Sequence, residues 1–154
     1  MKLLVLTFAT LTLAFAVDPF LGTWKPNVEK WKLSPGAQER LKQEVITLEL
    51  AGKDQYREII KVDGKSTEEQ TVVWDIDGKD HEFKNGQPGS SKWQRIDERH
   101  LRVSVSSAKG TAVTDYVVAA DNNTLTVTRN GIGPTSGRTL DELLVYKRQP
   151  TESK

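Results

Sequence analysis

Cysteine is absent from this sequence of 154 residues, and histidine occurs only twice, at His81 and His100. Without cysteine the chain has no disulfide, no thiolate metal ligand and no thiol nucleophile. The chain also has no large excess of charge of one sign, because 22 Lys and Arg residues are interspersed with 21 Asp and Glu residues. Nucleic-acid binding predicts a basic stripe along the chain, so this charge pattern argues against a nucleic-acid partner.

Long apolar runs are missing everywhere except at the N-terminus. A positive start at Lys2 is followed by an apolar run from Leu3 to Phe15 and by the small-x-small sequence Ala14-Phe15-Ala16. This layout is typical of a secretory signal peptide cleaved after Ala16. The run is shorter than the ~20 residues that a transmembrane helix needs. We therefore expect a secreted or periplasmic protein with a signal peptide at 1–16, one domain at 17–149 and a polar tail at 150–154.

The remaining chain alternates apolar and polar residues with a period of two, which is typical of β-strands. Tight-turn signals such as Asp77-Gly78 separate the strands. The strands are expected at about 20–25, 45–51, 56–61, 71–76, 80–84, 92–96, 101–106, 113–118, 124–128 and 140–148. We read 87–91 as a loop because of its Gln-Pro-Gly-Ser-Ser composition, and 130–137 as a loop because it is rich in glycine.

One segment, residues 27–44, has no clear period. Ser34-Pro35 is a helix-start signal, and helix-forming residues follow it, so the pattern favours a short helix at about 35–43. An irregular loop lying across one end of the sheet is the alternative.

Strands of this kind, with one apolar face and no helices to cover it, must curl on themselves or pack on a second sheet. Closure also removes exposed sheet edges. The sequence therefore predicts an all-β fold, an antiparallel up-and-down β-barrel of about 8–10 strands.

The first strand carries Phe20-Leu21-Gly22-Thr23-Trp24-Lys25. This stretch resembles the opening of the lipocalins and especially of the fatty-acid-binding proteins. The resemblance implies that Trp24 closes one end of the barrel, with a basic residue of the last strand, Lys147 or Arg148, packed across it. Gly22, Trp24, Lys147 and Arg148 would together form a structural latch.

The chain as a whole resembles uncharacterised lipocalin-like proteins exported by bacteria, through Gly22 to Lys25, Arg95 to Asp97, Leu125 to Thr128 and Val145 to Gln149. Fatty-acid-binding proteins hold the ligand carboxylate with Arg-x-Tyr on the last strand. The matching residues here are Leu144-Val145-Tyr146, so the arginine is missing. The resemblance thus implies the fold more than the ligand.

No catalytic or metal-binding motif stands out. The residues Asp75, Asp77 and Asp80 do not have the spacing of a calcium loop, and turn formation explains them. Both histidines are better explained as surface or turn residues than as haem ligands. We therefore expect no enzyme activity, no catalytic residues, no metal and no cofactor; an uncharacterised hydrolase is the alternative.

The aromatic residues are the candidates for a binding site. Four of them, Trp74, Trp93, Tyr116 and Tyr146, could line an apolar cavity for a small hydrophobic ligand. The alternative is a packed interior, since barrels of ~8 strands are only just wide enough to hold a ligand. A packed barrel would serve as an envelope-associated or protein-interaction module.

Overall fold

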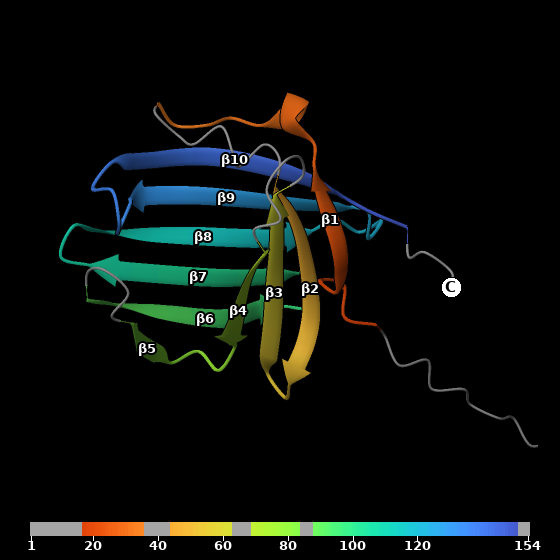
Figure 1. Cartoon of the computed structure of the whole chain (residues 1–154), viewed down its shortest axis with the longest axis horizontal. Coiled ribbons are helices and arrows are strands. Elements are labelled where there is room, and N and C mark those ends of the chain that lie inside the picture. Colours follow the sequence, from red (N-terminus) through yellow and green to blue (C-terminus); the bar gives the residue numbers. More distant parts are fainter. Residues whose placement is uncertain (1–16, 36–43, 63–68, 84–87, 151–154) are drawn as a thin grey trace, which may run out of the picture.

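A computed structural model describes residues 17–35, 44–62, 69–83 and 88–150. They form one sheet of ten antiparallel strands (Figure 1). The strands are β1 (Gly22–Pro26), β2 (Glu44–Gly52), β3 (Gln55–Val62), β4 (Glu69–Asp75), β5 (Asp80–Phe83), β6 (Gly89–Asp97), β7 (His100–Ser107), β8 (Gly110–Val118), β9 (Thr124–Ile132) and β10 (Thr139–Arg148). The predicted all-β, up-and-down fold is confirmed.

The strand order is β4-β3-β2-β1-β10-β9-β8-β7-β6-β5, so β1 joins the two halves of the sheet. In Figure 1, strands β1 to β4 cross strands β6 to β10, as expected for a sheet that curls strongly. The edge strands β4 and β5 follow each other in the chain, and no backbone pairing between them is found in the described residues. Two backbone bonds hold their connection: Ile76 N–H donates to Asp54 C=O and Gly78 N–H to Trp93 C=O, at 2.8 and 2.9 Å.

A 3-10 turn, η1 (Val28–Lys30), follows β1. The chain then runs beside β10, where Lys32 pairs with Leu143 (Figure 1). The Ser34 hydroxyl accepts a 2.9 Å hydrogen bond from the Asp141 N–H. These contacts place the 27–34 segment along β10 beyond the short strand β1.

Two loop predictions were wrong in part, because strand β6 begins at Gly89 and strand β9 ends only at Ile132. Gly89 to Ser91 belong to β6, where they pair with both β5 and β7. A Cβ at Gly89 would lie 2.3 Å from the Ser106 carbonyl oxygen. Glycine at this position therefore allows β6 and β7 to lie close together and does not form a turn. Likewise β9 continues to Ile132, and a Cβ at Gly131 would lie 2.4 Å from the Thr111 carbonyl oxygen.

The first strand begins at Gly22, and Phe20 lies in the turn before it. The predicted signal peptide at 1–16 and all but the first residue of the predicted helix at 35–43 lie outside the described residues. Within the part of the chain that the structure describes, no helix is long and apolar enough to cross a membrane.

The hydrophobic core lies at one end of the curled sheet. Its largest fully buried side chains are Trp24, Tyr146, Phe20, Leu125, Leu144, Val118 and Val127. They come from β1, β8, β9, β10 and the turn before β1. This set fills the interior at the end where the sheet closes through β1.

Candidate functional site

Three of the four aromatic residues predicted to line a pocket lie in one row. Trp74 on β4 contacts Trp93 on β6 with ring centroids 4.6 Å apart, and Trp93 contacts Tyr116 on β8 at 5.4 Å. The first contact spans the gap between the sheet edges, because β4 is one edge strand and β6 adjoins the other. Tyr146 is buried on the inner face against Trp31 at 5.5 Å, and it is close enough to Arg129, Glu44 and Glu58 for their charges to affect its pKa.

Charged residues accompany these rings on the inner face. Glu58 on β3 is only 6% exposed, and its Oε2 accepts a 2.9 Å hydrogen bond from Trp74 Nε1. Arg129 on β9 lies opposite Glu142 on β10, with Nη1 and Oε2 3.7 Å apart. Glu44 on β2 is buried as well. We call Glu44, Glu58, Arg129 and Glu142, with Trp74, Trp93 and Tyr116, the interior cluster.

The charged members of the cluster lie close enough to change the pKa values of their neighbours. Burial raises the pKa of Glu58, and the nearby Glu44 carboxylate raises it further. The hydrogen bond from Trp74 and the charge of Arg129 act in the opposite direction. Burial also raises the pKa of Tyr116, as does the nearby Glu58 carboxylate, whereas the adjacent Arg129 guanidinium lowers it.

One polar atom of the cluster has no protein partner. The Trp93 side chain is 6% exposed, and its Nε1 is the buried side-chain nitrogen or oxygen atom without a hydrogen bond in the described structure. A buried indole N–H usually finds an acceptor, and leaving it unpaired costs about 1–3 kcal/mol. A ligand with an acceptor atom beside these rings would form a hydrogen bond with the Trp93 N–H.

Burial along the inner face changes from one end of the sheet to the other. The inward residues nearest Trp24 are fully buried, whereas Ile60, Val72, Trp74, Thr114, Tyr116 and Arg129 are only partly buried. These six residues share the inner face with the core, as the strand register shows. The interior is therefore packed at the Trp24 end, whereas toward the other end partly buried side chains lie among buried ones such as Trp93, Val103 and Ala112.

The proposed latch residues lie at the packed end. The Arg148 guanidinium lies over the Trp24 ring, 4.2 Å from its centroid, and donates to the Pro19 and Leu21 carbonyls. A Cβ on Gly22, which has a φ of +126°, would lie 2.7 Å from Arg148 Nη1. Lys147 is exposed and pairs with Lys25 on the outer face, so Arg148 alone covers the ring.

The same end carries a second closing contact. Arg95 Nη2 lies 2.8 Å from Asp18 Oδ2, and the Tyr56 hydroxyl contacts both side chains. A hollow of about 290 Å³ adjoins these residues. Because their polar groups bind one another, this hollow offers a ligand few free partners.

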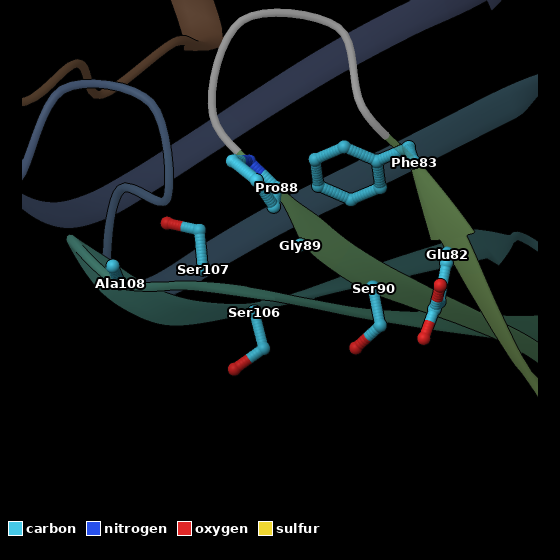
Figure 2. A pocket seen from close by; sticks show the side chains of 8 residues that line it. All are labelled: Glu82, Phe83, Pro88, Gly89, Ser90, Ser106, Ser107 and Ala108. Carbon is cyan, nitrogen blue, oxygen red and sulfur yellow. The ribbon is translucent and has the colours of Figure 1, made fainter.

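A hollow of about 390 Å³ lies at the opposite end, beside the ends of β5, β6 and β7 (Figure 2). Phe83 and Pro88 lie on one side of its strands, whereas the Ser90 and Ser106 hydroxyls and the Glu82 carboxylate point to the other. The Ser107 hydroxyl lies on the side of Phe83 and Pro88 but donates to the Pro134 carbonyl, so we do not take the hollow as the site.

Neither histidine lies in the interior cluster. His81 Nε2 is 2.9 Å from Asp77 Oδ1, and His100 Nε2 is 2.6 Å from Asp115 Oδ1. The described residues contain no group of three or more His, Asp or Glu side chains that could hold a metal ion.

The charged members of the cluster were missed by sequence reasoning, although the sequence contains a signal for them. Glu58 stands in phase with Tyr56 and Ile60, which alternation assigns to the inner face. Arg129 is likewise in phase with Leu125 and Val127. A charged residue at a strand position that otherwise carries inward apolar side chains therefore indicates a buried charge.

The fold is similar to that of solved fatty-acid-binding and related proteins. A Schistosoma mansoni fatty-acid-binding protein in complex with arachidonic acid is 19% identical, with a TM-score of 0.58 over 86% of this chain and 98% of that one. Fatty-acid-binding protein 1 of Echinococcus granulosus is 15% identical, with a TM-score of 0.62 over 87% and 100%. A secretory abundant heat soluble protein of Ramazzottius varieornatus is 14% identical, with a TM-score of 0.61 over 86% and 97%.

These likenesses show that the chain has the same up-and-down antiparallel fold as the fatty-acid-binding proteins. No protein-family model matches the sequence, and no curated protein does.

Proposed function

We propose that this protein is an exported, non-catalytic barrel that binds a small, mainly apolar molecule on its inner face. The observation that carries the proposal is the row formed by Trp74, Trp93 and Tyr116, with the unpaired Trp93 N–H inside it. Aromatic walls with a few polar groups are the usual lining of small-molecule sites. The similar protein from Schistosoma mansoni, solved with arachidonic acid, supports a hydrophobic ligand.

Export is supported by the sequence of residues 1–16 and by the resemblance to lipocalin-like proteins exported by bacteria. Expression of the full chain in a bacterium tests it. Cleavage would give a secreted or periplasmic product that begins at Val17 in mass spectrometry. A cytoplasmic product that keeps Met1 would contradict export and leave the binding proposal untouched.

Ligand binding is tested by titrating the protein with fatty acids, retinoids and haem while following tryptophan fluorescence. We expect saturable quenching for at least one class, since Trp74 and Trp93 would lie against the ligand. The Trp74→Phe, Trp93→Phe double variant should lose most of the quenching, whereas the Trp31→Phe control should keep it. Absence of saturable quenching with every class would favour the packed barrel that acts through its surface.

A further inference from the structure

The hollow of about 290 Å³ at the packed end lies next to the start of the aromatic row. Tyr56 lines this hollow from β3, and its register partner on the inner face of β4 is Trp74. Arg95 lines the hollow from β6, where it lies two positions beyond Trp93 on the same face of the strand. Tyr56 and Arg95 therefore stand between the hollow and the contact of Trp74 with Trp93.

Three side chains close the hollow toward the interior, and we call Asp18, Tyr56 and Arg95 the gate. Asp18 Oδ2 accepts hydrogen bonds from the Tyr56 hydroxyl and from Arg95 Nη2, the second at 2.8 Å. Arg95 also donates to the Tyr56 hydroxyl, and its guanidinium lies 5.7 Å from the centroid of the Tyr56 ring. The gate thus joins β3 to β6, two strands that are not neighbours in the sheet.

The gate is held mainly by side chains, unlike the latch over Trp24. Arg148 of the latch donates to three main-chain carbonyls, whereas Arg95 has one such acceptor in the described residues, at Glu98. The Arg95 and Asp18 side chains are 35% and 23% exposed, and ion pairs in contact with water add little stability. The contacts of the gate therefore break more easily than those of the latch.

Apolar side chains lie on the outer side of the gate. Leu50 on β2 is the register partner of Tyr56 and so belongs to the inner face, yet it is 59% exposed. Ile76, which follows β4, lines the same hollow and is only partly buried. An apolar ligand that rests on Leu50 and Ile76 would leave water at a position directly outside the gate.

For the proposed ligand to reach the aromatic row, side chains must move. Three hollows in the described part of the chain, of about 390, 290 and 700 Å³, are lined by none of Trp74, Trp93 and Tyr116. On β6 the largest gap separates Trp93 from Gly89, which lines the 390 Å³ hollow, whereas Arg95 is nearer to Trp93 along the strand. The gate is thus the shorter way to the row.

We propose that the gate opens to admit the ligand from the 290 Å³ hollow to the aromatic row and closes again behind it. This inference rests on the proposed function and adds the route to its site. Opening breaks the hydrogen bonds among Asp18, Tyr56 and Arg95 and leaves the strand pairing intact. Because the gate is closed both before and after binding, its strength sets the rates of entry and release and has little effect on affinity.

Stopped-flow fluorescence with Nile red, a neutral apolar dye, measures both rates. Tyr56→Phe removes the hydroxyl and keeps the ring, and Arg95→Gln removes the guanidinium. Each should raise the association and dissociation rate constants by about threefold or more and change Kd by less than about twofold. Arg99→Gln is the matched control and should keep the wild-type rates, because Arg99 binds Ala119 and Asn122 outside the gate.

A further variant should have the opposite effect. Leu50→Trp adds volume at the hollow without touching the hydrogen bonds of the gate, and the exposure of Leu50 leaves room for the larger side chain. It should lower both rate constants by about threefold or more. Nile red is excited directly, so the added tryptophan does not disturb the signal. Circular dichroism of each variant shows whether the fold is kept.

The outcomes separate the gate from the proposed function. Wild-type rates in folded Tyr56→Phe and Arg95→Gln, or an equal acceleration in Arg99→Gln, would overturn the gate and leave the binding proposal intact. Weaker binding with an unchanged association rate would show that these side chains hold the bound ligand, which also overturns the gate. Absence of saturable binding by Nile red and by every ligand of the fluorescence titration would overturn the proposed function and the gate with it.

Discussion

Trp24 is the residue on which closure of the packed end depends. It is 0% exposed, its indole N–H donates to the Phe20 carbonyl at 3.0 Å, and Arg148 covers its outer face. Trp24→Ala should lower the free energy of unfolding by ~3–5 kcal/mol, because it leaves a cavity and removes these contacts. Urea denaturation measures this loss. A loss below about 1 kcal/mol would contradict the latch.

Gly22 is required beside that latch for two reasons. Its φ of +126° is unfavourable for other residues, and an added Cβ would lie 2.7 Å from Arg148 Nη1. Gly22→Ala should therefore destabilise the fold by ~1–3 kcal/mol. Gly137→Ala is the control, because φ there is +69° but no atom lies within 4 Å of an added Cβ. Equal losses in the two variants would show that the contact with Arg148 has no effect.

His81 provides a pH-dependent contact outside the site. Its hydrogen bond with Asp77 raises the pKa of the imidazole, and the Asp75 charge adds a smaller effect. The stabilisation is complete below the ordinary pKa of about 6.5 and is lost as the pH rises through the raised value. In an NMR titration of His81, Asp77→Asn should lower the imidazole pKa, and Asp75→Asn should lower it less. The reverse order would contradict the assigned contacts.

At the scale of the element, alternation in the sequence predicted about 8–10 strands, because successive side chains of a strand point in turn to water and to the interior. It failed where glycine serves close strand packing, as at Gly89 and Gly131, since glycine in a sequence also marks turns. The sequence predicted the residues of the aromatic row, Trp74, Trp93 and Tyr116, but it did not predict which of their rings are in contact. Which rings meet depends on the strand register and on the curl that brings β4 near β6.

The pairing of β3 with β4 places a buried carboxyl group next to Trp74, and Glu58 should affect the dependence of stability on pH. Burial raises the pKa of Glu58, so the folded protein holds this proton more firmly than the unfolded chain. Its contribution to stability therefore falls as the pH rises from the ordinary glutamate pKa through the raised value. Glu58→Gln should remove that fall.

Urea denaturation of the wild type and of Glu58→Gln between pH 4 and pH 8 measures the effect as a difference between the two proteins. The variant should gain stability relative to the wild type as the pH rises. Glu49→Gln, on the exposed face of β2, should follow the wild type. Parallel curves for the wild type and Glu58→Gln would show that the Glu58 pKa is not raised.

At the scale of the whole molecule, the two ends of the sheet differ in burial and in charge. The Trp24 end is filled with buried side chains and closed by Arg148 and by the contacts among Asp18, Tyr56 and Arg95. The other end holds the partly buried residues and the charged cluster. The sequence left a packed interior and a binding interior as alternatives; the Trp24 end is packed, and binding at the other end is the function that we propose.

This division predicts a gradient in amide hydrogen exchange. Strands β1, β2, β9 and β10 have neighbours on both sides and pack on the core, whereas β4 and β5 each pair with one strand only. Stability is not uniform in such a structure, and regions with fewer buried contacts open more often. Amides of β4 and β5 should therefore exchange faster than those of β1 and β10. At saturation, a ligand that quenches tryptophan fluorescence should slow exchange in β4 and β6, which carry Trp74 and Trp93, more than in β1 and β10. Equal slowing in all strands would place the ligand outside the interior cluster.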